Sequence, residues 1–256
     1  MHISILGAHN RETPTSRCVS IVIDDTLALD AGGLTSSLSP LEQRKLEAIM
    51  LTHQHFDHIK DIPIIAINLF NYGNSIDLYS TEDVRNSIEN HILNGQVYPR
   101  FQELPEGKPT VIFNSILPYE KQRIDGHEIM GVPVNHCKGT IGYQVSDNAN
   151  KSVFYTADTG PGLVDCWTHV SPQLLIVDVT QPNMYEEFAV KSGHLSPRLL
   201  KEELIKFKVT TGYLPRIVAI HMDPAREKEI AAEIEEIAEL LDISIILAQE
   251  GMQLYI

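Results

Sequence analysis

The chain has 256 residues, of which 43% are hydrophobic and 21% are charged. This length allows a large buried core, and the composition excludes a disordered or collagen-like protein. The formal net charge of -14 disfavours broad contact with a nucleic-acid backbone, although bound metal ions can still attract a small anionic substrate. The three cysteines are widely spaced, which argues against a disulfide framework or a cysteine-rich zinc site.

The apolar run at residues 1–7 is short and lacks the basic start of a signal peptide. No apolar segment is long enough to span a membrane. We therefore expect a cytoplasmic protein with no membrane partner. A homodimer is plausible, because two-fold dimers are the commonest soluble oligomers.

Apolar and alternating runs predict strands along the whole chain. In chain order, the predicted strands are residues 3–6, 19–23, 27–29, 48–51, 77–79, 111–116, 129–134, 140–145, 152–155, 174–177, 217–220, 243–247 and 252–255. Helix-start signals predict helices at 41–46 and 59–70, after Thr81, from Ser196-Pro197 to about 207, and from Asp223-Pro224 to about 241. Strands come first and then alternate with helices, which favours one mixed-sheet α/β domain over residues 1–256.

The strongest chemical signal is the segment His53-Gln54-His55-Phe56-Asp57-His58, which directly follows an apolar strand. Side chains two residues apart on an extended chain point the same way, so His53 and His55 can share one ion. Asp57 and His58 lie where the chain turns into a helix and can face a second ion. Imidazole and carboxylate ligands together suit zinc, manganese or iron.

Three later residues of ligand type also follow apolar strands. His136 comes after the strand at 129–134, Asp158 after the strand at 152–155, and His221 after the strand at 217–220. The carboxyl ends of strands are where open α/β sheets commonly present ligands. Each of these three residues is a weak signal alone. Together with the histidine segment at 53–58, they predict one site.

This ordered set resembles the signature of the metallo-β-lactamase superfamily. The resemblance implies a four-layer αββα sandwich of two mixed sheets flanked by helices. It also implies this ligand set: His53, His55 and His136 for one ion, Asp57, His58 and His221 for the other, and Asp158 bridging both. Two such ions, expected to be zinc, can share a water and lower its pKa to give a bridging hydroxide. Asp57 could in addition orient that nucleophile.

The segment Gly193-His194-Leu195-Ser196-Pro197 resembles the phosphodiesterase branches of the superfamily. In one of these branches, the tRNA 3′-processing endonucleases, the matching histidine assists protonation of the leaving oxygen, and the resemblance implies this role for His194. His194 could instead cap or pack at a helix start. Further fragments resemble the class II cyclic-nucleotide phosphodiesterases: Asp30-Ala31-Gly32-Gly33, Asn90-His91-Ile92-Leu93-Asn94, Val97-Tyr98-Pro99, Asn135-His136 and Thr156-Ala157-Asp158-Thr159-Gly160-Pro161. The expected reaction is therefore hydrolysis of 3′,5′-cyclic nucleotides to 5′-nucleotides.

Other functions stay open. The segment Ile59-Lys60-Asp61-Ile62-Pro63 lacks the small residues associated with the class II enzymes. A tRNase Z-like RNA 3′-processing endonuclease is one alternative, but the loop at 95–109 has only Arg100 and Lys108 as basic residues. A thioesterase or lactonase would leave His194 unexplained. A metal-binding sensor or partner protein is the non-enzymatic alternative. Lys138 and Arg11 are candidate phosphate contacts, although both are more often solvated surface charges.

Overall fold

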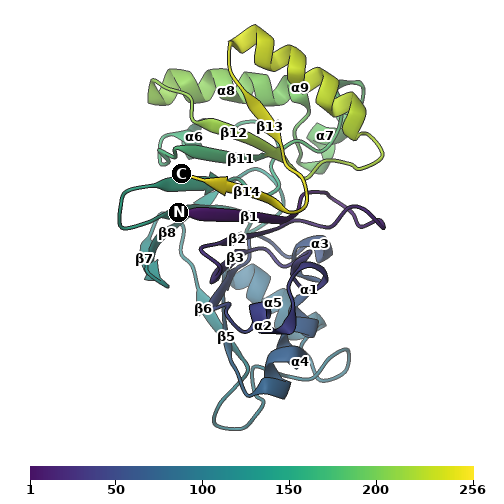
Figure 1. Cartoon of the computed structure of the whole chain (residues 1–256), viewed down its shortest axis with the longest axis vertical. Helices are drawn as coiled ribbons and strands as arrows, with labels where there is room; N and C mark the ends of the chain where they lie inside the picture. The colour runs from purple at the N-terminus through teal and green to yellow at the C-terminus, as the bar shows by residue number, and fades with distance from the viewer.

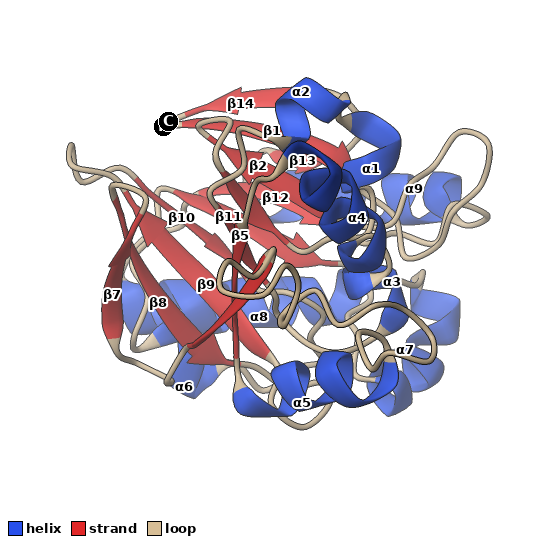
Figure 2. Cartoon of the chain, turned by 90° about the horizontal axis from the view of Figure 1, so that it is seen from below, coloured by secondary structure: helices blue, strands red, loops and turns tan.

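The computed structural model describes residues 1–256 and contains two seven-stranded sheets stacked face to face, with helices outside them (Figures 1 and 2). The first sheet has the strand order β14-β1-β2-β3-β4-β5-β6. Its strands are β1 (His2–Gly7), β2 (Ser20–Ile23), β3 (Leu27–Leu29), β4 (Ala48–Met50), β5 (Ile76–Ser80), β6 (Val111–Ser115) and β14 (Met252–Tyr255). The ends of the chain meet here, because β1 and β14 pair antiparallel (Figure 1).

The second sheet has the order β13-β12-β11-β10-β9-β8-β7. Its strands are β7 (Lys121–Ile124), β8 (His127–Pro133), β9 (Ile141–Ser146), β10 (Ser152–Tyr155), β11 (Leu174–Asp178), β12 (Arg216–Ile220) and β13 (Ile245–Leu247). Strands β10 to β13 run parallel, as do β3 to β6 in the first sheet. Both sheets are therefore mixed, and the carboxyl ends of their parallel strands provide the loops on which the site is built.

The helices divide between the two outer faces. Against the first sheet lie α1 (Leu34–Ser37), α2 (Pro40–Gln43), α3 (Phe56–Ile59), α4 (Ile62–Tyr72) and α5 (Glu82–His91). The second half of the chain contributes α6 (Val164–Trp167), the 3₁₀ turn η1 (Asn183–Tyr185), α7 (Glu186–Ser192), α8 (Pro197–Thr211) and α9 (Glu227–Leu241). Figure 1 shows α8 and α9 covering the outer face of β11 to β13. No helix combines the length and apolar character needed to cross a membrane.

Three apolar clusters fill the spaces between these four layers. A cluster of 25 buried residues joins the facing sides of the two sheets, with Ile5 and Ile21 from one and Tyr143 and Val218 from the other. A cluster of 20 residues lies between the second sheet and its helices, and one of 19 lies between the first sheet and α1 to α5. Strands covered on both faces are apolar, which explains why β4 is a continuous apolar run and why β11 is one until its last residue, Asp178.

The four-layer fold with two mixed sheets confirms the predicted fold class. Most predicted strands are present, whereas β7 was not predicted. The predicted helix at 59–70 is wrong as a single element, because the chain breaks at Lys60 and Asp61 between α3 and α4. Thr81 lies at the N-cap of α5, but its hydroxyl donates to the carbonyl of Gly139 and makes no cap hydrogen bond. Helix α9 begins at Glu227, later than its predicted start.

Candidate metal centre

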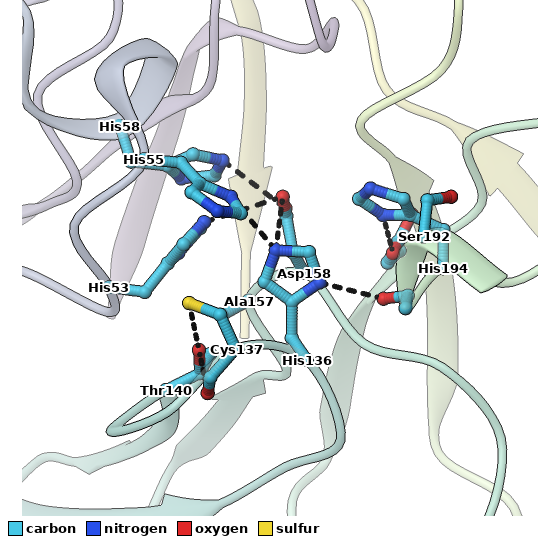
Figure 3. Close-up of polar contacts among 12 residues, drawn as sticks. His53, His55, His58, His136, Cys137, Thr140, Ala157, Asp158, Ser192 and His194 are labelled. Carbon is cyan, nitrogen blue, oxygen red and sulfur yellow. Dashed lines mark hydrogen bonds and ion pairs between the residues drawn. The ribbon is translucent and has the colours of Figure 1, made fainter. Parts of the chain in front are cut away.

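The histidine segment leaves the carboxyl end of β4 and enters α3. His53 is fully buried, His55 occupies the N-cap position of α3, and Asp57 and His58 lie in its single turn. His136 follows β8, Asp158 follows β10, and His221 follows β12. The structure therefore brings the seven predicted ligand residues together from loops of both sheets (Figure 3 shows most of them).

One half of the cluster consists of His53, His55 and His136 around one oxygen of Asp158. His55 Nδ1 lies 3.0 Å from His136 Nε2, and Asp158 Oδ2 lies 3.6 Å from His53 Nε2 and 3.8 Å from His136 Nε2. Zinc–nitrogen bonds of about 2.0–2.1 Å put tetrahedral ligand atoms about 3.3 Å apart. These separations fit a single ion.

The other half consists of Asp57, His58 and His221 around the second oxygen of the same carboxylate. Asp158 Oδ1 lies 3.2 Å from His58 Nε2 and 3.4 Å from His221 Nε2. Asp57 Oδ2 lies 3.5 Å from His58 Nε2 and 3.4 Å from His221 Nε2. Because its two oxygens face different halves, Asp158 has the geometry of a bridging ligand.

Three buried atoms at the middle of the cluster make no well-aligned hydrogen bond: His53 Nε2, His58 Nε2 and Asp158 Oδ1, the last two being in contact at 3.2 Å. Leaving buried polar atoms unpaired is costly. All three face the interior of the cluster, where a cation would satisfy them. The donor set of imidazoles and carboxylates therefore fits two divalent ions, although it does not select between zinc, manganese and iron.

The ring nitrogens that face away from the cluster are held by the surrounding structure. His58 Nδ1 bonds to Asp30 Oδ2 at 2.8 Å, and His136 Nδ1 to the Gly193 carbonyl at 2.9 Å. The Nδ1 atoms of His53 and His221 meet the hydroxyls of Thr52 and Thr180 at 3.0 and 2.8 Å. Such outer contacts set the ring orientation of metal-binding histidines and leave Nε2 directed inward.

Gly193 is required at its position for two reasons. It ends α7 with a φ of 76°, and a Cβ atom there would lie 2.8 Å from His136 Nδ1. Three non-glycine residues at the site also have positive φ: Asp30 (58°), Ala157 (60°) and His221 (70°). Such backbone conformations cost free energy and tend to occur where function requires them.

The carboxylates and imidazoles of the cluster shift one another's pKa values strongly. Burial opposes ionisation of Asp158, but the neighbouring His221 and His58 hold its pKa well below the usual range. Burial likewise lowers the pKa of His221, but the carboxylates of Asp158, Asp178 and Asp57 outweigh it and raise that pKa to about 10. Before an ion binds, the cluster therefore retains protons that the ion must displace.

His194 lies beside the cluster and is held by a carboxylate absent from the predicted site. Its Nδ1 bonds at 2.8 Å to Oδ2 of Asp178, the fully buried last residue of β11. The His194 ring centroid lies 4.9 Å from that of His136 and 5.2 Å from that of His221. The Asp178 oxygens also accept from the Thr159 amide and the Thr180 hydroxyl, so protein donors already engage both oxygens.

The two candidate phosphate contacts lie apart from each other. The Lys138 ammonium bonds to Asp83 at 2.7 Å and lines the pocket that contains His55 and His136. Arg11 is paired with Asp223 and lines a different pocket, which contains none of the predicted metal ligands. The site is open to solvent on the side of His55, which is exposed, whereas His53 and His58 are fully buried.

Residues 20–222 match the family model described as a beta-lactamase superfamily domain. No curated protein sequence matches the chain. Similar solved structures include unliganded yeast PDE1 (TM-score 0.85, 16% identity, covering 100% of this chain and 99% of that one) and the short form of human tRNase Z (0.74, 17%, 100% and 99%). A third is a diphosphatase from the PhnP family (0.62, 17%, 100% and 97%). At these identities, the structural likeness establishes the fold. The match over most of the chain confirms the resemblance inferred from the histidine segment: this chain belongs to the beta-lactamase superfamily.

Proposed function

We propose that this member of the superfamily is a hydrolase that uses two divalent ions to cleave phosphodiesters, with 3′,5′-cyclic nucleotides as substrates and 5′-nucleotides as products. The observation that carries the proposal is the His194–Asp178 pair, which lies beside the predicted metal-ligand residues and would supply a proton donor there. The names of the similar structures, PDE1, tRNase Z and a diphosphatase, also favour chemistry at phosphate.

Two ions bound here would lower the pKa of a water molecule and neutralise negative charge on the substrate. His53, His55 and His136 would hold the first ion, Asp57, His58 and His221 the second, with Asp158 between them. Asp57 has a second role in the proposal. Its carboxylate is partly exposed, with 30% of the side-chain surface accessible, so it can also orient the attacking water.

His194 would protonate the departing oxygen. Burial disfavours its charged form, but the Asp178 carboxylate outweighs this effect and raises the His194 pKa. With Nδ1 bonded to Asp178, the proton available to a substrate is on Nε2. A thiolate is a much weaker base than an alkoxide and can leave without a proton, so a proton donor at this position favours a phosphodiesterase over the thioesterase alternative.

The test is hydrolysis of 3′,5′-cyclic AMP and cyclic GMP by metal-loaded protein, with products separated by chromatography. The proposal predicts a 5′-nucleotide from the wild type and a loss of about 10²–10⁴ in rate for His194→Ala. His169→Ala is the control, because that exposed histidine bonds only within its own turn. Cleavage of bis(p-nitrophenyl) phosphate without cyclic-nucleotide turnover would refute cyclic nucleotides as the substrates and support phosphodiester hydrolysis as the reaction. Inactivity on all three with two ions bound would refute the proposal.

A further inference from the structure

A second feature of the site is a cavity of about 630 Å³ beside the first half of the metal cluster. His55 and His136 form part of its lining, and the residues after β8 and the end of α7 form its walls. Its volume lies in the range of about 300–1,000 Å³ that is typical of small-molecule sites. Substrate bound at the metal cluster would therefore extend into this cavity.

The charge of the cavity differs from that of the whole chain. The sequence has 34 acidic and 20 basic residues, yet the cavity lining contains two lysines, Lys138 and Lys191, and no carboxylate. Lys191 forms no ion pair, whereas Lys138 is partly neutralised by Asp83 at 2.7 Å. In an acidic protein, a cavity wall with two lysines and no carboxylate favours the binding of an anion there.

The other polar side chains of the cavity are already engaged. The Asn135 amide donates to the carbonyls of Pro161 and Gly162, and the Ser192 hydroxyl donates to the carbonyl of Phe188. Lys191 itself is placed by the end of α7, two residues before the Gly193 carbonyl that holds His136. The free ammonium of Lys191 is therefore the main group that this wall offers to a ligand.

We infer that the cavity is a subsite for a second anionic group, so that a phosphodiester with an additional phosphate binds more tightly than a cyclic nucleotide, which has only the scissile one. This inference rests on the proposed function. The scissile phosphate would lie at the metal cluster, with the additional phosphate beside Lys191. Lys138 contributes less, because Asp83 competes with the substrate for its ammonium.

The kinetic test compares two chromogenic substrates that differ by one phosphate: thymidine 5′-monophosphate p-nitrophenyl ester and its 3′-phosphorylated form. Lys191→Met should raise KM for the 3′-phosphorylated substrate about two- to fivefold, the effect of losing a partly exposed ion pair, with little change for the other. Asp83→Asn should lower the same KM by freeing Lys138. Lys151→Met, at an exposed turn remote from the cavity, should change neither. Equal KM changes for both substrates in Lys191→Met would overturn the inference.

A binding measurement separates this inference from the proposed function. Calorimetric titration with adenosine 3′,5′-bisphosphate and with adenosine 5′-monophosphate requires no turnover. The inference predicts tighter binding of the bisphosphate by the wild type and loss of that preference in Lys191→Met. If neither chromogenic substrate is cleaved but the preference is present and depends on Lys191, the proposed function fails and the subsite stands. Equal affinities in the wild type would refute the subsite.

Discussion

Asp30 provides a sharp test of how the second half of the metal cluster is held. It is fully buried, and its Oδ1 accepts the Thr52 amide at 2.9 Å. Its Oδ2 accepts from the hydroxyls of Thr52 and Tyr155 and from His58 Nδ1, at 2.9, 3.1 and 2.8 Å. An asparagine here preserves shape but replaces one acceptor oxygen with an NH₂ group. That group must then face a buried donor, whichever way the amide is turned.

The favoured orientation of Asp30→Asn keeps the oxygen toward His58 and leaves the Thr52 amide unpaired. One unpaired buried donor costs about 1–3 kcal/mol of folding free energy. Loss of the carboxylate beside a metal-binding histidine weakens metal affinity about 10- to 100-fold, which corresponds to about 1.4–2.7 kcal/mol. Denaturant unfolding of the apo-protein measures the first effect, and zinc competition against a chromogenic chelator measures the second.

Glu203→Gln is the matched control for Asp30→Asn. Glu203 is also buried and accepts from the Gly162 and Leu163 amides and the Trp167 indole, and it makes no hydrogen bond to a predicted metal ligand. It should lose similar stability and bind zinc like the wild type. The reasoning is refuted if Asp30→Asn keeps wild-type zinc affinity, or if Glu203→Gln loses as much affinity as Asp30→Asn.

Three further predictions follow from the charged groups. Asp178→Asn should lower the His194 pKa, so that the alkaline fall in kcat begins at a lower pH; an unshifted profile would contradict the role of this pair. Metal binding should release protons from His221, whose pKa is raised to about 10, and from His58, whose pKa the Asp158 and Asp30 carboxylates raise well above 6.5 despite burial. Calorimetry in buffers of different ionisation enthalpy measures that release, and buffer-independent heats near pH 7 would count against it. Burial lowers the His9 pKa, but Glu250 outweighs this effect and raises the pKa above 6.5. The stabilisation that the His9–Glu250 pair gives to the folded state is therefore complete below pH 6.5 and is lost as the pH rises through the folded-state pKa. His9→Gln should therefore cost more stability at pH 6 than at pH 9 in denaturant unfolding, and an equal cost at both would argue against the His9–Glu250 pair.

Much of the fold was predictable because the buried parallel strands are continuous apolar runs, which local pattern identifies well. The candidate ligand residues were identified for a related reason, since each segment that contains them follows such a run. Asp178 follows the run at 174–177 in the same way as Asp158 follows β10, so this signal was available for it too. Its function as the partner of His194 depends on a turn 16 residues away, which no local pattern specifies.

Other features depend on contacts between distant segments. The break between α3 and α4 coincides with the Asp61 amide donating to the Ala31 carbonyl and the Asp61 carboxylate accepting the Thr35 amide. The apolar periodicity of 59–70 contains no sign of these bonds. Lys138 and Asp83 are 55 residues apart in the sequence. Lys138 could therefore be predicted as a phosphate contact, whereas the ion pair that engages its ammonium could not be predicted.

Metal-titrated hydrolysis of bis(p-nitrophenyl) phosphate tests the central claim most directly. Protein stripped of metal would be reconstituted with increasing equivalents of zinc or manganese, with bound metal counted by mass spectrometry at each step. A dinuclear phosphodiesterase predicts negligible cleavage by the apo-protein and activity that rises until two ions are bound per chain. Two bound ions without cleavage, or full activity in the stripped protein, would contradict it.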